Sequence, residues 1–285
     1  MPFPELFAEL LQNCRPMALA FSGGLDSRFL AHSALALLPT PGDLCLIHVC
    51  GPHVPEDESR AADAWARARG LQLIMTHFDP LEIEAVRSGW KDRCYYCKKA
   101  MFLRILQTLE TMGATAGNQR VLCDGSNASD NLAWRPGLAA LRELGVRSPL
   151  AEAGLDKQDI SALGAASGLD NPRQKARPCL LTRFAYGLEP DKVTLAALEA
   201  AERAVSALLT THAQKAEPPD FRLRLVSRRA AAKPGKPLSV WQSELHVEAE
   251  LPDALVRELE ALLAAAGFDP GFVLCLEQVS GHYDK

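Results

Sequence analysis

Short apolar runs alternate with helical patterns through the first half of the chain. The apolar runs have the length and composition of buried parallel strands, and they lie at Met17–Phe21, Leu44–Val49, Leu71–His77 and Val121–Asp124. Between them, apolar residues recur at helical spacing, at about residues 27–38, 57–69, 81–88 and 98–111. This alternation predicts an α/β fold with a doubly wound, mostly parallel sheet, which binds its ligands beyond the carboxyl ends of the strands.

The pattern changes in the second half of the chain. Two helical segments, at about 137–144 and 156–166, lead to a proline-flanked stretch at 171–187. An alanine-rich helix then precedes two strands, a further helix and a last strand, at about 191–209, 221–226, 244–249, 253–266 and 272–276. We therefore expect an α/β domain over residues 1–187 and a smaller C-terminal α+β domain over residues 188–285, with a flexible loop at 230–237.

Composition narrows the class of function. The chain has 285 residues, of which 48% are hydrophobic, and this is enough to bury two cores. With 31 basic and 35 acidic side chains the formal net charge is −4, whereas proteins that wrap nucleic acid usually carry a basic surface. The chain begins with an acidic amphipathic pattern, and no apolar run approaches the roughly 20 residues of a membrane span. We therefore expect a cytoplasmic protein with neither a membrane nor a nucleic acid as its partner.

The segment SGGLDS, which starts at Ser22 and which we call the glycine-serine loop, directly follows the first predicted strand and opens a helix. Gly23 and Gly24 allow the backbone to approach a ligand closely, and the N–H groups at a helix N-terminus attract an anion. Ser22 and Ser27 add hydroxyl donors. Asp26 would repel a bare phosphate, so its presence indicates a Mg²⁺ ion between this carboxylate and a pyrophosphate. The spacing differs from both the P-loop and the dinucleotide-binding fingerprint, and the alternative is a simple glycine-rich turn.

A second polar segment, DGSNASD, follows the last of the predicted parallel strands. Its Gly125, Asn127 and Asp130 would lie at the same edge of the sheet as the glycine-serine loop. Such residues are also common in ordinary turns, so this segment alone indicates little.

Cys94 and Cys97 form the clearest local metal-binding signal among the eight cysteines of the chain. In RCYYCKK their spacing places both sulfur atoms on one side of a helix start, where the helix dipole, Lys98 and Lys99 lower the pKa of the thiols. A structural zinc site needs four ligands, and no second CxxC or HxxxH pair is visible. A redox dithiol of the thioredoxin type is a further alternative, but the surrounding sequence does not fit that fold.

Cys179 is the third candidate ligand, in the Pro- and Arg-rich turn RPCLLTR. This environment favours the thiolate. Three thiolates without an obvious fourth ligand describe an iron–sulfur cluster with one open iron better than a closed zinc site. The alternative is an ordinary exposed cysteine in a loop.

Four segments carry a resemblance to a known family: AFSGGLDS, DRCYYCKKAMF, CDGSNASDNLAWRPGLAALRELGVRSPLAEAGLDKQDI and CLLTRFAYG. They occur in matching order within roughly the first 190 residues, and they resemble the LarE-type ATP-dependent sulfur transferases of the PP-loop superfamily, which build the nickel-pincer nucleotide cofactor. The resemblance implies an adenine nucleotide alpha hydrolase-like PP-loop fold. It also implies that ATP adenylates a carboxylate of a pyridinium dicarboxylate mononucleotide with release of pyrophosphate, and that sulfur then displaces AMP to give a thiocarboxylate.

Two sulfur sources occur in enzymes of this kind. In one, a single cysteine at the position of Cys179 forms a thioester and surrenders its own sulfur. In the other, three cysteines hold a 4Fe-4S cluster whose open iron carries sulfide, which a sulfur donor must replace. Because Cys94 and Cys97 accompany Cys179, the chain resembles the three-cysteine form.

The resemblance also implies roles for single residues. Those expected to hold ATP and Mg²⁺ are Ser22, Gly23, Gly24, Asp26, Ser27, Gly125, Asn127 and Asp130. Those expected to be catalytic are Asp26, Cys179 and Arg183, of which Arg183 would balance the charge of the adenylate.

Further residues of the C-terminal half match the family less closely. Arg222 and Arg224 resemble an R-x-R pair that reaches the substrate phosphate, since alternation along a strand points both to one face. Glu199 and Glu202 stand where family members carry acidic residues. Trp90 would stack on the flat pyridinium ring, with ordinary packing as the alternative. The resemblance also suggests a homo-oligomer, with a hexamer as the expected state.

Two features depart from the family pattern, and they concern the substrate more than the chemistry. The segment 172–177 lacks the usual tryptophan and Lys-Pro pair, and His246 stands roughly where an acidic residue is usual.

Three alternative classes share single features with the chain. A tRNA thiolation enzyme predicts a basic surface, which the charge of −4 does not favour. An amide-forming synthetase does not need the three cysteines, and a non-catalytic module would bind ATP or metal without releasing pyrophosphate.

Overall fold

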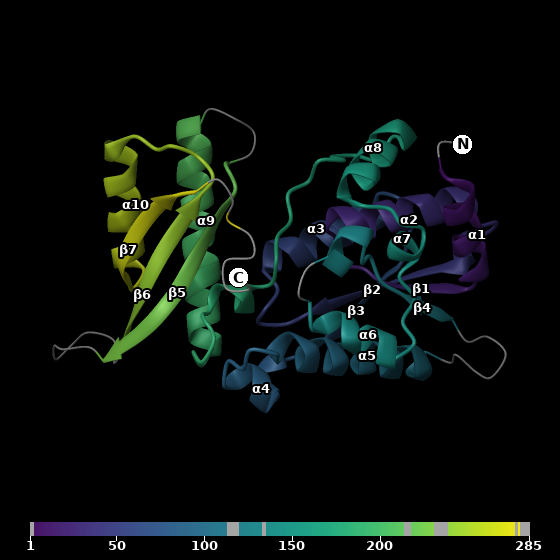
Figure 1. Cartoon of the computed structure of the whole chain (residues 1–285), viewed down its shortest axis with the longest axis horizontal. Helices are drawn as coiled ribbons and strands as arrows, with labels where there is room; N and C mark the ends of the chain where they lie inside the picture. The colour runs from purple at the N-terminus through teal and green to yellow at the C-terminus, as the bar shows by residue number, and fades with distance from the viewer. Residues whose placement is uncertain are drawn as a thin grey trace. The chain divides into compact units, whose positions relative to one another are not determined.

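The computed structural model describes residues 3–112, 120–132, 135–213, 218–230, 239–276 and 279. The contacts of the chain divide it into two compact units (Figure 1). The first contains the residues up to Ile83 together with Asp92–Arg177, and the second contains Glu84–Lys91 together with the residues from Pro178 onward. The loop predicted at 230–237 lies, apart from its first residue, outside the described residues. Among the described residues, no helix is long and apolar enough to span a membrane.

A four-stranded sheet forms the centre of the first unit. Its strands are β1 (Met17–Ala20), β2 (Leu44–Cys50), β3 (Leu73–His77) and β4 (Val121–Cys123), in the spatial order β3-β2-β1-β4. Every pairing is parallel, and Ala18 of β1 lies opposite both Cys45 of β2 and Leu122 of β4. The predicted parallel sheet is therefore confirmed. Because β1 and β4 are neighbours, the loops that follow them start at the same edge of the sheet.

Helices cover both faces of this sheet (Figure 1). The helices on one face are α1 (Glu5–Asn13), α2 (Leu25–Leu37), α3 (Glu56–Arg67), α7 (Pro149–Glu152) and α8 (Lys157–Ser167). Those on the other face are α5 (Arg93–Thr111) and α6 (Gly137–Glu143). The side chains of β1 alternate between two separate cores, because Met17 and Leu19 join the first and Ala18 joins the second. Short 3-10 turns complete the unit at η1 (Pro41–Asp43), η2 (Pro80–Glu82) and η3 (Ala128–Leu132).

Two helices predicted in the first half of the chain differ markedly from the structure. The helix expected at 98–111 is α5, which begins five residues earlier, at Arg93. The helix expected at about 81–88 is divided into η2 and α4 (Glu84–Arg87). The side chain of Asp79 accepts a hydrogen bond of 3.0 Å from the N–H of Leu81, and this local bond closes a tight turn where the pattern suggested a helix.

A three-stranded mixed sheet forms the centre of the second unit. Its strands are β5 (Phe221–Ala230), β6 (Ser239–Val247) and β7 (Phe268–Cys275), in the order β5-β6-β7. The pair β5/β6 is antiparallel and the pair β6/β7 is parallel. Helix α9 (Lys192–Ala213) contacts β5, and α10 (Asp253–Ala265) contacts β7. The predicted α+β character of the C-terminal part is therefore confirmed.

The register of β5 and β6 separates apolar from polar side chains. Leu223 lies opposite Leu245, and these buried residues share one face of the sheet. Arg222 lies opposite His246 and Arg224 lies opposite Glu244, on the other face. The two arginines therefore point to the same side, as strand alternation predicts.

Residues 178–187 belong to the second unit, whereas the sequence pattern placed the domain boundary after residue 187. Phe184 forms an isolated parallel bridge to Leu225 of β5, and the N–H of Ala185 donates to the Leu225 carbonyl at 3.0 Å. A 3-10 turn, η4 (Leu180–Arg183), precedes this bridge and contacts both α9 and β5. These contacts depend on tertiary pairing that no local pattern in the segment reveals.

Candidate functional site

The glycine-serine loop begins where β1 leaves the sheet and ends in the first turn of α2. Gly23 has a positive φ of 80°, which a residue with a side chain rarely adopts. A Cβ atom on Gly23 would also lie 3.0 Å from the Cβ of Ala62 on α3, so the loop packs directly on this helix. Both observations explain why glycine occupies this position.

Two serine hydroxyls hold the shape of the loop. Ser27 Oγ donates to the carbonyl of Gly24 at 3.0 Å, and it lies 3.1 Å from Ser22 Oγ. Because the hydrogen of Ser27 is directed at Gly24, the hydroxyl of Ser22 is the donor in the contact between the two serines. The N–H of Gly24 points back to Ser22 Oγ at 3.3 Å. Ser27 is buried and holds the loop through these two contacts, whereas Ser22 is exposed.

The second polar segment meets the glycine-serine loop at the end of β4. The side-chain amide of Asn127 donates a hydrogen bond of 2.9 Å to the carboxylate of Asp26. A Cβ atom on Gly125 would lie 3.0 Å from the backbone nitrogen of Ser27, so only glycine lets the two backbones approach this closely. Asp130 in turn accepts from the N–H of Asn127 at 3.1 Å. The structure therefore brings the two predicted loops together, and their binding roles stay predictions.

Asp26 is the charged group at the centre of this arrangement. Partial burial raises the pKa of Asp26, against the hydrogen bond from Asn127 and the positive charges of Lys157 and Arg135, which lower it. A carboxylate whose ionised form is destabilised in this way gains from a bound cation. The donor set and the cramped glycine backbone fit the expected Mg²⁺ and phosphate groups.

Sequence reasoning did not single out Lys157 and Arg135. Arg135 forms an ion pair of 2.9 Å with Asp130, and the backbone N–H of Lys157 points to Ser129 Oγ at 3.4 Å. Lys157 is the first residue of α8, directly after a capping box that begins at Asp156. The helix-start signature was visible in the sequence, but the proximity to Asp26 depends on the fold.

Cys94 and Cys97 lie in the first turn of α5, as their spacing predicted. Cys94 is exposed and Cys97 is half-buried. The ammonium group of the next residue, Lys98, lies 3.7 Å from the carboxylate of Asp124, at the carboxyl end of β4. Lys99 bonds the carboxylate of Glu143 on α6 at 2.8 Å. The two lysines therefore join the start of α5 to neighbouring parts of the first unit.

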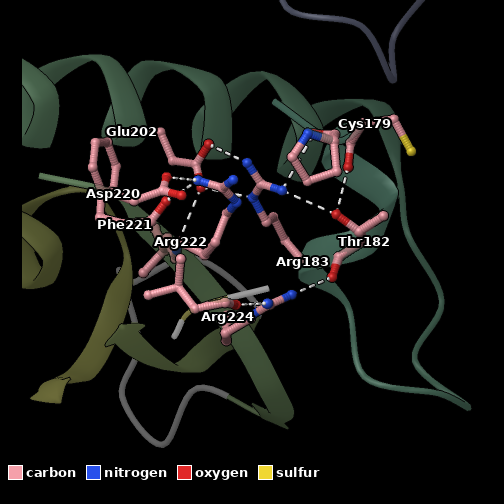
Figure 2. Close-up of polar contacts among 11 residues, drawn as sticks. Cys179, Thr182, Arg183, Glu202, Asp220, Phe221, Arg222 and Arg224 are labelled. Carbon is pink, nitrogen blue, oxygen red and sulfur yellow. Dashed lines mark hydrogen bonds and ion pairs between the residues drawn. The ribbon is translucent and has the colours of Figure 1, made fainter. Parts of the chain in front are cut away.

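Cys179 lies at the start of η4 in the second unit (Figure 2). The carbonyl of Cys179 accepts from the N–H of Thr182 at 3.0 Å and from its hydroxyl at 2.8 Å. The guanidinium of Arg183 donates to the Thr182 hydroxyl at 2.9 Å and to the Pro178 carbonyl at 3.3 Å. The sulfur atom of Cys179 points away from the guanidinium groups. Hydrogen bonds therefore hold the backbone both before and after this half-buried cysteine, at Pro178 and at Thr182.

Glu202 of α9 completes the support of this turn. Its carboxylate accepts two bonds from Arg183, from Nε at 2.7 Å and from Nη2 at 3.0 Å, and a third from the N–H of Leu223 at 3.1 Å. Arg183 is only 4% exposed, so this bidentate pair is largely removed from water. In this structure Arg183 links the cysteine turn to α9 and β5, and its expected contact with an adenylate stays a prediction.

The two arginines of the R-x-R pair are also buried and hydrogen-bonded (Figure 2). Arg222 donates to the Asp220 carboxylate and to the Phe221 carbonyl, both at 2.6 Å. Arg224 donates to the carbonyls of Thr182 and Val279, at 2.8 and 2.6 Å. Arg224 therefore gives the turn at Cys179 a further contact with β5.

The remaining predicted residues have varied surroundings. His246 is fully buried, and its Nε2 lies 2.9 Å from the carboxylate of Glu244; burial lowers the pKa of His246. Glu199 pairs with Arg203 one turn further along α9. Trp90 belongs to the second unit and is 46% exposed, and its expected stacking on a pyridinium ring stays a prediction.

The three expected cluster ligands are distributed over the two units. Cys94 and Cys97 belong to the first unit and Cys179 belongs to the second. Within the described part of the chain, no three histidine, cysteine or acidic side chains are grouped as metal ligands. The three-cysteine cluster therefore stays a prediction.

Fold and loop geometry together define the class of protein. A parallel α/β sheet whose first strand leads through SGGLDS into a helix is the arrangement of the PP-loop class. A scan against models of known protein families gives no match for this chain.

Three curated proteins are similar to a large part of this chain. A pyridinium-3,5-bisthiocarboxylic acid mononucleotide synthase from Lactiplantibacillus plantarum is 31% identical over 198 residues, which is 70% of each chain. Uncharacterised proteins from Synechocystis and Methanocaldococcus jannaschii are 30% and 31% identical, over 65% and 61% of this chain and 66% and 63% of their own lengths. The chain belongs to the LarE family, to which the synthase from L. plantarum belongs.

Proposed function

We propose that this chain is an ATP-dependent sulfur transferase that converts a carboxylate of a pyridinium mononucleotide into a thiocarboxylate. The observation that carries the proposal is the 2.9 Å hydrogen bond from Asn127 to Asp26, beside the close packing of Gly125 on Ser27. These contacts support one phosphate and Mg²⁺ site built from two loops at one edge of the sheet. The relative from L. plantarum, a pyridinium-3,5-bisthiocarboxylic acid mononucleotide synthase, supports the substrate class.

The first step activates the carboxylate. A carboxylate oxygen of the substrate attacks the α-phosphorus of ATP, and the bond from this phosphorus to the bridging oxygen breaks, so that pyrophosphate leaves with the electron pair. The N–H of Gly23 would bind a phosphate oxygen, and the N–H of Gly24 and the hydroxyl of Ser22 would exchange their present bonds, to Ser22 Oγ and Ser27 Oγ, for bonds to phosphate oxygens. A Mg²⁺ ion held by Asp26 would neutralise the charge that develops on pyrophosphate. Asn127 keeps the Asp26 carboxylate oriented.

The second step delivers sulfur. Hydrosulfide attacks the carbonyl carbon of the acyl adenylate, the bond to the AMP oxygen breaks, and AMP leaves while the sulfur loses its proton to water. A 4Fe-4S cluster held by Cys94, Cys97 and Cys179 would supply the sulfide when bound. The chemistry of the donor set fits this group, because cysteine thiolates are the usual ligands of iron–sulfur clusters. All three cysteines are also at least partly exposed.

A second candidate uses the sulfur of Cys179 itself. Its thiolate would displace AMP to form a thioester, and loss of the Cα proton would then break the Cβ–Sγ bond, leaving dehydroalanine and the thiocarboxylate. The direction of the Cys179 sulfur, away from the arginines that hold its turn, favours access for an acyl group (Figure 2). The same protein preparation distinguishes the two candidates, because only the second changes the mass of the protein.

The test uses anaerobically purified chain reconstituted with iron and sulfide, supplied with Mg-ATP and carboxylated pyridinium mononucleotides. We expect pyrophosphate, AMP and a thiocarboxylate in equal amounts, and an unchanged protein mass if the cluster is the sulfur source. Asp26→Ala should abolish pyrophosphate release, whereas Asp63→Ala, at a surface ion pair of α3, should not. Pyrophosphate release without a thiocarboxylate would contradict the sulfur transfer. The mass of the assembly in solution tests the expected homo-oligomer.

A further inference from the structure

His48 is a buried histidine of β2 that lies beside the start of the glycine-serine loop. It is 1% exposed, and its Nδ1 lies 2.9 Å from the carbonyl oxygen of Phe21 while its Nε2 lies 2.9 Å from the hydroxyl of Ser59. A carbonyl oxygen only accepts, so Nδ1 carries the hydrogen of this bond. In the neutral ring Nε2 is then an acceptor, and the Ser59 hydroxyl donates to it.

The carbonyl of Phe21 belongs to the last peptide before the loop. The N–H of Phe21 still donates to the Ile47 carbonyl at 2.8 Å, which continues the pairing of β1 with β2 by one residue. The next group along the backbone is the Phe21 carbonyl, which receives the side chain of His48. This bond therefore sets the orientation of the peptide that joins Phe21 to Ser22, from which the loop departs.

Ser59 connects the same point to α3. Ala62, one turn further along this helix, is the residue against which Gly23 packs, and Trp65, one more turn along, lies 5.2 Å from the Phe21 ring. Residues three apart lie on one face of a helix, so α3 presents this face to the loop. The contact from Ser59 through His48 to Phe21 and the contact from Ala62 to Gly23 fix the loop at two successive places.

We propose that His48 and Ser59 are positioning residues for ATP. By fixing the peptide before Ser22, they hold the backbone of the glycine-serine loop in the position that receives the phosphates. The inference rests on the proposed function, because it assumes that the loop binds ATP. It predicts that removing either side chain weakens the binding of Mg-ATP more than the binding of the carboxylate substrate. The effect would be indirect, through the position of the loop backbone.

His48→Leu replaces the imidazole with an apolar side chain of similar size and removes both hydrogen bonds. We expect the Kd of Mg-ATP to rise about tenfold or more, because small displacements of a binding group have large effects. The KM for ATP should rise accordingly, and the KM for the carboxylate substrate should not. His48→Asn retains an N–H close to the position of Nδ1 and should recover most of the affinity. Ser59→Ala removes only the outer bond and should have an intermediate effect.

His53→Leu is the matched control. His53 is also a buried histidine of the first unit, and its ring packs edge-on against Phe78 at 5.9 Å. Its removal should change the stability of the protein but not the Kd of Mg-ATP. Both variants are measured by calorimetric titration of Mg-ATP into the full chain at a temperature where circular dichroism shows them folded.

The outcomes separate this inference from the proposed function. Equal affinity of His48→Leu and wild type, or equal loss in His53→Leu, would overturn the positioning role. If the wild type binds Mg-ATP but releases no pyrophosphate, the proposed function fails and the comparison of affinities still decides on His48. If the wild type does not bind Mg-ATP, both proposals are overturned.

Discussion

The side-chain amide of Asn127 donates a hydrogen bond of 2.9 Å to the carboxylate of Asp26, which lies 101 residues earlier in the chain. The bond is possible because β1 and β4 are parallel neighbours, so the loops after them begin side by side. It joins the acidic residue of one loop to the amide of the other. The proposed phosphate site thus depends on the pairing of two distant strands as well as on the SGGLDS sequence.

Loss of this amide should impair the activation step. In Asn127→Ala, Asp26 loses the hydrogen bond that orients its carboxylate, so the carboxylate should be displaced from the position in which it binds Mg²⁺, and its pKa should rise further because that bond lowers it. We expect pyrophosphate release to fall by about ten- to a hundredfold, a range typical for a residue that orients a metal ligand. Asn127→Asp should be worse than Asn127→Ala, because it places a second carboxylate beside Asp26. Equal rates in the two variants would contradict an electrostatic role.

Asp26 should lower the stability of the ligand-free protein at neutral pH. Burial raises the pKa of Asp26 above its ordinary value of 3.8, so the folded state binds the proton more tightly than the unfolded state. The stability from this group is fully present below the unfolded pKa and is lost as the pH rises through the folded pKa. Asp26→Asn should therefore increase the free energy of unfolding at pH 7.5 more than at pH 4.5, as measured in urea. A larger gain at the lower pH would contradict the sign.

The variant Asp26→Asn also tests the role of Asp26 in pyrophosphate release. Asp26→Asn should lose pyrophosphate release even as it gains stability, because an amide does not replace the carboxylate as a Mg²⁺ ligand. Asp63→Asn on α3 is the control, since its ion pair with Arg67 lies at the surface and should contribute little to either quantity. Added Mg-ATP should stabilise the wild type and not Asp26→Asn.

Protonation of His53 should destabilise the folded protein in mild acid. Burial lowers the pKa of His53 to about 4 from its ordinary value of 6.5. A depressed histidine pKa means that the folded state binds the proton less tightly, so stability is present above pH 6.5 and falls as the pH decreases toward 4. Between pH 7.5 and 5 the loss should be roughly 2 kcal/mol.

His53→Gln tests this assignment because it removes the titrating group and keeps a polar side chain. Urea unfolding of wild type and variant at pH 7.5 and pH 5 should show a smaller pH dependence in the variant. An identical dependence in both proteins would assign the acid sensitivity to other groups.

The parallel sheet and the glycine-serine loop were predictable because their signals are local. Val121–Asp124 was expected as a strand and β4 covers Val121–Cys123, since a short apolar run bounded by turn residues has few other structures available. Contacts between distant segments were not predictable in the same way. His48 carries no local motif, and the helix-start signature beside Lys157 does not reveal that this residue lies near Asp26, because both proximities depend on the fold. Arg183 was expected to balance the charge of the adenylate, and its pairing with Glu202, nineteen residues further along, was not predictable from the sequence.

The pair formed by Arg183 and Glu202 should control the geometry of the Cys179 turn. Glu202→Ala removes the acceptor of three hydrogen bonds and leaves a buried guanidinium without its carboxylate. Breaking one side of a buried pair typically costs about 3–5 kcal/mol. We expect a loss of that order in the free energy of unfolding. Where the protein remains folded, the thiol of Cys179 should react faster with iodoacetamide, because its turn has lost a support.

Glu199→Ala provides the matched control for this prediction. Glu199 lies on the same helix and also pairs with an arginine, Arg203, but 54% of the Arg203 side chain is exposed. Exposed pairs contribute at most about 1 kcal/mol, so this variant should unfold almost like the wild type. Glu202→Gln keeps one carbonyl oxygen for Arg183 and should lie between the two. If Glu202→Ala alkylates at Cys179 no faster than Glu199→Ala, the carboxylate serves only the packing of α9, and the cysteine turn holds its shape through Arg224 and Thr182.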